Sequence, residues 1–77
     1  MPKKNSSATF AVCVDNSDYP AALELHKIYT VLLDEDAARE GQLRIVDESG
    51  EDYLYAAHRF MLIDVPRELA RELRGRA

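Results

Sequence analysis

Short apolar runs alternate with polar, turn-forming segments along this chain of 77 residues. The runs are rich in β-branched and aromatic residues, which favour strands. Asp, Asn, Ser, Gly and Pro, the residues that favour turns, gather between them. The pattern predicts a mainly β fold with five strands, at 9–14, 27–33, 43–46, 53–55 and 60–63.

The stretch 41–55 carries the clearest local signal. A turn-forming set at 47–50 separates two strand-like runs, which predicts a β-hairpin. Gly50 supplies the turn position at which a positive φ costs little. The acidic residues of this turn are interpreted as solvated. The expected core positions of the hairpin are Leu43, Ile45, Tyr53 and Tyr55.

The connections between the strands also have recognisable compositions. Residues 15–25 contain a proline and predict an irregular loop with Leu23 folded back over the core. For Tyr19 two positions are open: it also folds over the core, or it is exposed beside Val46 and Leu54 as part of a partner surface. Residues 34–41 begin with acidic side chains and end in glycine, which suits one helical turn or a charged loop. Residues 56–59 do not alternate, and we expect a tight 3₁₀-like turn there.

Strands in this order, with a long first loop, an acidic second loop, a tight third hairpin and a 3₁₀-like turn before the last strand, resemble the small barrel of Src-homology-3-like (SH3-like) proteins. The run 25–32 looks like the second strand of that fold, 47–55 like its distal hairpin, and 56–60 like its 3₁₀ turn and last strand. The resemblance implies a five-stranded SH3-like small barrel at 9–65. Residues 1–8 lack apolar periodicity, and we expect a flexible N-terminal lead there, while a short C-terminal α-helix is expected at 66–77.

Over about residues 10–65 the chain also resembles a group of short, uncharacterised bacterial proteins that share the phrase Val-Asp-Glu-Ser-Gly-Glu-Asp-Tyr-Leu-Tyr, found here at 46–55. Readers of proline-rich peptides in the SH3 family line their groove with a Trp, a Pro and a Tyr. This chain has no Trp, and Ala56 and Arg59 stand at about the places of the Pro and the Tyr. The resemblance therefore implies a fold and a bacterial origin, without a polyproline groove or a transferable site.

The C-terminal segment predicts a short amphipathic helix at 66–75. A proline suits its first turn and a glycine its end, and Val65, Leu69 and Leu73 recur every four residues along one stripe. A helix this short needs packing to hold it. Two packing arrangements are open for this apolar stripe: it packs over the open end of its own barrel, or it packs against a second copy or another protein.

Charge is unevenly distributed along the chain. The net charge is −4, but residues 8–64 hold four basic and twelve acidic side chains, a net charge of −8, between two mildly basic ends. An acidic body repels a phosphate backbone, which argues against nucleic-acid binding by the barrel itself. The polar N-terminus and the short apolar run after it suit neither a signal peptide nor a membrane span, so the cytoplasm is the expected location.

The chain offers few groups for catalysis. Cys13, His26 and His58 are the nucleophile and base candidates, and a cysteine within an apolar strand of an acidic domain is interpreted as structural. One cysteine forms no intramolecular disulfide, and two isolated histidines do not make a metal site. The acidic turns lack the spacing of a calcium loop. We therefore expect no enzyme activity, no cofactor, and no catalytic or metal site.

A small protein-interaction or accessory module is the function that these observations favour. The partner would be an unknown protein, or a second copy bound through the C-terminal helix, with no membrane involved. The alternative is a nucleic-acid-associated small barrel that uses the basic ends together with Lys3, Lys4, Arg44 and Arg59. The candidate partner surface consists of apolar, aromatic and basic residues that the core does not require: Tyr19, Val46, Leu54, Arg59, Leu69 and Leu73.

Overall fold

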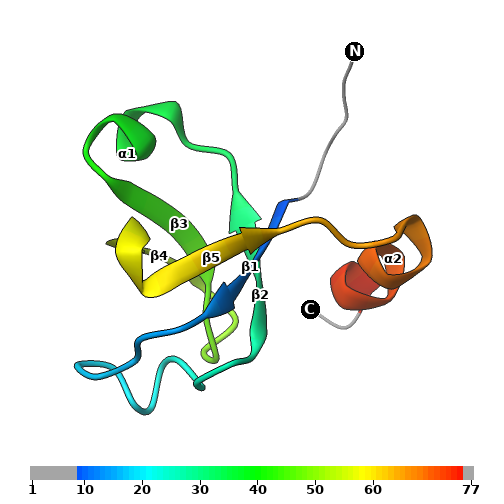
Figure 1. Cartoon of the computed structure of the whole chain (residues 1–77), viewed down its shortest axis with the longest axis horizontal. Coiled ribbons are helices and arrows are strands. Elements are labelled where there is room, and N and C mark those ends of the chain that lie inside the picture. The colour runs from blue at the N-terminus through cyan, green and yellow to red at the C-terminus, as the bar shows by residue number, and fades with distance from the viewer. Residues whose placement is uncertain (1–8, 76–77) are drawn as a thin grey trace.

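The computed structural model describes residues 9–75, which form one antiparallel sheet of five strands and a short C-terminal helix (Figure 1). The order across the sheet is β4-β3-β2-β1-β5, and the sheet is not closed. The prediction of a mainly β fold is confirmed, whereas the lead predicted at 1–8 lies outside the described residues. The strands are β1 (Thr9–Cys13), β2 (Ile28–Leu32), β3 (Gln42–Val46), β4 (Asp52–Ala56) and β5 (Phe60–Ile63).

Three short helical segments connect or follow the strands. The first begins after Asp34, whose side-chain oxygen accepts a hydrogen bond from the Ala37 N–H at 3.0 Å. The second is the 3₁₀ turn that leads directly into β5, and the third follows β5 after a short connection. The 3₁₀-like turn and the C-terminal helix predicted from the sequence are therefore confirmed, and of the two structures left open for residues 34–41 the helical turn is the one that forms. Their bounds are α1 (Glu35–Arg39), η2 (Ala57–Arg59) and α2 (Arg67–Gly75).

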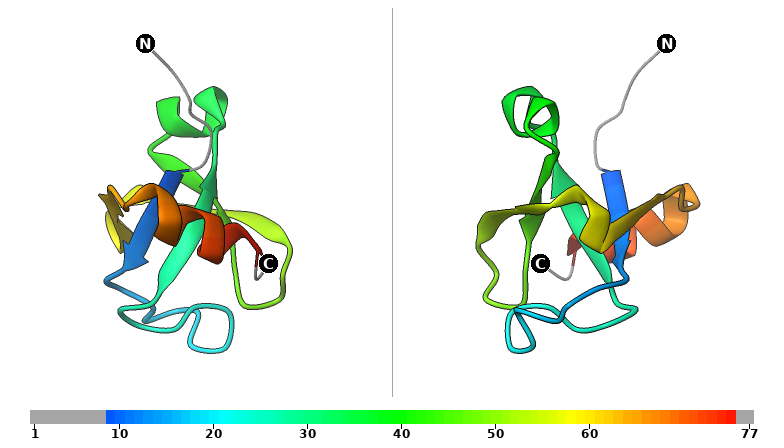
Figure 2. Two further views of the ribbon diagram at one scale, coloured as in Figure 1. Left: turned by 90° about the vertical axis from the view of Figure 1, so that its right-hand side faces the viewer. Right: turned by 60° about the vertical axis from the view of Figure 1, so that its left-hand side comes forward.

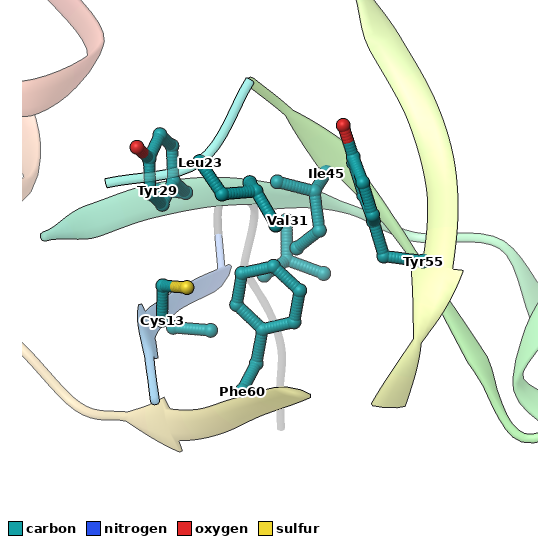
Figure 3. Close-up of a cluster of buried hydrophobic side chains, with 8 residues drawn as sticks. Cys13, Leu23, Tyr29, Val31, Ile45, Tyr55 and Phe60 are labelled. Carbon is teal, nitrogen blue, oxygen red and sulfur yellow. The ribbon is translucent and has the colours of Figure 1, made fainter. Parts of the chain in front are cut away.

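The core lies on the inner, concave face of the sheet. The buried side chains come from every strand and point toward one another, and Leu23 reaches in from the loop between β1 and β2 (Figure 3). The Phe60 ring meets the Tyr55 ring edge-on, with 6.1 Å between the centroids. Tyr53 is 49% exposed, so its predicted core position is wrong. The core members are Ala11, Cys13, Leu23, Tyr29, Val31, Ile45, Tyr55 and Phe60.

The outer face of the sheet is also apolar where β5, β1 and β2 run together. Phe10 lies opposite Thr30 on β2 and Ile63 on β5, so these three side chains share the face that points away from the core. Helix α2 lies over this face, crossing β1 and β2 toward the β3–β4 hairpin (Figure 2). Phe10 is only 2% exposed. The helix is therefore a second layer on the outer face.

Candidate interaction surface

The C-terminal end of α2 forms a hollow with the sheet beneath it. Leu73 lines this hollow, whose volume is about 450 Å³, together with Ile28, Thr30 and Val46 from the outer face. The hairpin turn at 47–50 supplies a polar rim on one side. Helix and sheet therefore meet incompletely here, and a space with an apolar floor and polar sides, Lys27 among them, stays open between them.

Four of the six residues of the predicted partner surface line this hollow or lie on the same side of the molecule. Val46 and Leu73 line the hollow itself. Leu54 shares the outer face with Arg44, its cross-strand partner, and is a diagonal neighbour of Val46. Leu69, on α2, is 39% exposed. The structure thus brings four of the six predicted residues to one side of the molecule.

The other two predicted residues, Tyr19 and Arg59, form a separate pair. The Tyr19 ring meets the Tyr55 ring edge-on, at 5.0 Å between centroids, and therefore lies on the core side of the sheet. The Arg59 guanidinium stacks over the Tyr19 ring, 4.9 Å from its centroid. The six residues consequently make two surfaces on opposite sides of the sheet.

Arg59 is held in place by carboxylates of the first loop. Its guanidinium lies 2.6 Å from Asp18 and 3.4 Å from Asp15, and its side chain is only 11% exposed. The hydrogen bond to Asp18 raises the pKa of Arg59. The Arg59 carbonyl also accepts hydrogen bonds from the N–H groups of Val14 and Asp15. Arg59 therefore pins the first loop to η2 and has little capacity for a partner.

Asp47, at the rim of the hollow, is a buried carboxylate that sequence reasoning missed. It is 6% exposed, so the interpretation of this turn residue as solvated is wrong. It accepts hydrogen bonds from the Tyr55 hydroxyl at 2.6 Å and from the Ser49 hydroxyl and N–H at 2.6 and 2.9 Å. Burial raises the pKa of Asp47, but these hydrogen bonds outweigh it and the net shift is downward. The Asp-x-Ser spacing, typical of an Asx turn, was the available signal.

A second network of hydrogen bonds holds the carboxylate of Glu48, the residue after Asp47. Glu48 accepts from Lys27 at 2.6 Å and from the Tyr29 hydroxyl at 2.5 Å, and the same hydroxyl accepts from the Glu24 N–H. The Lys27 bond, followed by the Tyr29 bond, lowers the pKa of Glu48. The Glu48 N–H donates to the carbonyl of Ala22. The first loop, β2 and the hairpin turn are thus joined at the edge of the hollow.

The catalytic candidates do not assemble into a site. Cys13 is fully buried in the core, and His58 is exposed on η2. His26 approaches Cys13 through its backbone, since its N–H donates to the Cys13 carbonyl at 2.7 Å. Within residues 9–75 no group of three or more His, Cys, Asp or Glu side chains is arranged to hold a metal ion.

No protein-family model, curated protein or solved structure matches this chain. Among the helices described, none is long and apolar enough to span a membrane. The geometry of the outer face is therefore the main basis for a functional proposal.

Proposed function

We propose that the protein is a non-enzymatic SH3-like small barrel that acts as a protein-interaction or accessory module. The strand order supports the barrel, because β1 lies between β2 and β5 and a 3₁₀ turn precedes β5. The hollow beneath Leu73 is the observation that carries the interaction role. It joins half-exposed apolar side chains of helix and sheet, which suits the apolar centre of a protein interface.

Charge defines the kind of protein partner that this surface suits. Arg67 and Arg71 lie on the exposed side of α2, and they form no ion pair with the residues that the structure describes. An acidic partner surface would complement them, and the acidic body of a second copy meets this requirement. Such a contact weakens with added salt, because exposed charges are screened.

Nucleic acid is a poorer partner for the described residues. Arg44 is ion-paired with Asp34 at 2.8 Å and with Asp52 at 2.9 Å, and Arg59 is held by two carboxylates in the same way. A phosphate would have to displace those carboxylates. We therefore propose a protein partner, while Lys3 and Lys4 lie outside the described residues.

The test compares partners captured by the wild type and by surface variants in quantitative cross-linking. Leu54→Ser and Leu69→Ser change exposed residues beside the hollow, and Leu33→Ser is the matched control because Leu33 is exposed at the opposite end of the sheet. We expect a specific partner to be lost with the first two variants and kept with the control. A partner set that is the same for all proteins would refute the proposed surface. Turnover of a substrate that disappears in Cys13→Ser would refute the non-enzymatic role.

A further inference from the structure

Strand β5 forms an outer edge of the sheet that carries none of the usual protection against pairing. Its sequence is Phe-Met-Leu-Ile, without a charge or a proline. Met61 is 64% exposed and Leu62 is 60% exposed, on opposite faces of the strand. The other edge, β4, begins with the charged Asp52. Outer strands in soluble proteins are normally guarded by charge, proline or a bulge, so the bare apolar edge of β5 is unusual.

The hydrogen-bond pattern shows which backbone groups face outward. The Arg59 carbonyl accepts hydrogen bonds from the N–H groups of Val14 and Asp15, which directly follow β1, so this carbonyl points toward β1. Because the backbone N–H and C=O groups of successive residues alternate in direction along a strand, those of Met61 and Ile63 also point toward β1. The N–H and C=O of Leu62 point away from β1, toward the open edge. The Phe60 N–H is already bonded to the Ala57 carbonyl. Among the loop hydrogen bonds of residues 9–75, none reaches the Leu62 N–H or carbonyl.

We propose that β5 pairs with β5 of a second copy in an antiparallel arrangement, with the two-fold axis at Leu62. Each Leu62 N–H then donates to the Leu62 carbonyl of the other copy. The Asp64 N–H of each copy donates to the free Phe60 carbonyl of its partner. Opposite residues of an antiparallel pair share a face, so Leu62 meets its own equivalent and Met61 meets Ile63.

Three features favour a second copy as the occupant of this edge. The pairing is self-complementary and closes after two copies, so it leaves no further edge of the same kind. It keeps the Asp64 carboxylates of the two copies at opposite ends of the paired strands, whereas parallel pairing would bring these like charges together. The added strand also covers an apolar hollow of about 180 Å³, which Leu62 lines with Leu33 and Leu43.

This dimer uses a different surface from the proposed partner site, and the two respond to salt in opposite directions. Each copy carries a net charge of −4, so two copies repel and added salt strengthens an apolar edge contact between them. Salt weakens a contact made by the α2 arginines. The sign of the salt effect therefore distinguishes the two contacts.

The experiment follows association of the full chain by sedimentation and by amide hydrogen exchange at concentrations up to about 1 mM, where a short edge contact is expected to form. We expect the Leu62 amide to gain protection with concentration, while the Met61 amide, bonded to β1, is protected throughout. Leu62→Pro removes the outward N–H without breaking the β1 ladder, and loss of its two hydrogen bonds weakens the dimer about thirty-fold.

Two further variants test the dimer independently of Leu62→Pro, one that should disrupt it and one that should leave it unchanged. Leu62→Lys retains the backbone N–H but places like charges on the two-fold axis, so it should also give a monomer, even where the proline variant fails to fold. Leu69→Lys alters the proposed partner surface and should leave the dimer unchanged. A wild type that stays monomeric at about 1 mM, or a dimer that persists in Leu62→Lys, would overturn the proposal. Neither result would bear on partner capture through Leu54 and Leu69.

Discussion

Replacing Tyr55 by Phe tests whether the buried carboxylate at the hairpin turn holds this fold together. The substitution deletes one hydroxyl and keeps the ring, so the edge contacts with Tyr19 and Phe60 remain. The substitution removes the hydrogen bond that the Tyr55 hydroxyl donates to the Asp47 carboxylate, at 2.6 Å. Asp47 stays buried, with Ser49 as its remaining partner. The variant therefore isolates one charge-assisted hydrogen bond.

The expected loss is about 2 kcal/mol of the free energy of unfolding, since a hydrogen bond to a buried charged group contributes about 1.5–3 kcal/mol. For a domain of this size such a loss lowers Tm by about 8–16 °C. Tyr53→Phe is the matched control, because Tyr53 lies two residues away on the same face and its hydroxyl bonds the exposed Glu51 at 3.0 Å. Its removal should change the free energy of unfolding by less than about 0.5 kcal/mol.

Urea unfolding at two pH values completes the test. The folded-state pKa of Asp47 is lowered, so its contribution is fully present above the unfolded pKa of about 4 and is lost as pH falls through the folded value. The difference between wild type and Tyr55→Phe should therefore be large at pH 7 and should shrink below about pH 4. Equal losses for Tyr55→Phe and Tyr53→Phe, or a difference that does not depend on pH, would show that the Asp47 bond is not a major source of stability.

Other predictions concern the loop, the turn and the helix. Tyr19→Ala removes an aromatic edge contact and a cation–π contact, and should cost about 1–2 kcal/mol in urea unfolding; no change would mean that the first loop is not anchored by its ring. Gly50→Ala should cost about 1 kcal/mol by the same measurement, because Gly50 has φ of 86°, although its Cβ would meet open space. Deleting residues 66–77 should expose Phe10, increase the binding of an apolar dye and reduce stability by about 2 kcal/mol. Unchanged dye binding would mean that α2 does not cover this face.

Sequence patterns predicted the strands well because each run of β-branched and aromatic residues is bounded by residues with strong turn preferences. They did not predict the exposure of Tyr53. Alternation along β4 assigns Tyr53 and Tyr55 to the same face of the sheet. It does not show that other core side chains cover Tyr55 but leave Tyr53 exposed. Tyr55 lies opposite Leu43 over the core, whereas Tyr53 lies nearer the turn, where its hydroxyl bonds Glu51.

The interaction surface was harder to predict, because it depends on where α2 lies. The apolar stripe showed that the helix needs a partner, but periodicity does not identify which face of the sheet provides it. Phe10 was the available hint, since it points away from Ala11 and Cys13 yet is strongly apolar. The separation of Tyr19 and Arg59 from Leu69 and Leu73 follows from the path of the first loop, which hydrogen bonds to Asp18 and Asp15 determine.

The position of β1 between β2 and β5 also constrains how this chain reaches its folded state. Phe10 pairs with Ile63, so the first strand completes its ladder only when nearly the whole described chain has come together. Such long-range pairing requires closure of a large loop before it contributes stability, which slows folding. A chain that stops before Phe60 lacks both a neighbour for β1 and the ring at the middle of the core. We therefore expect folding in a single cooperative step, with no stable fragment formed by the first four strands.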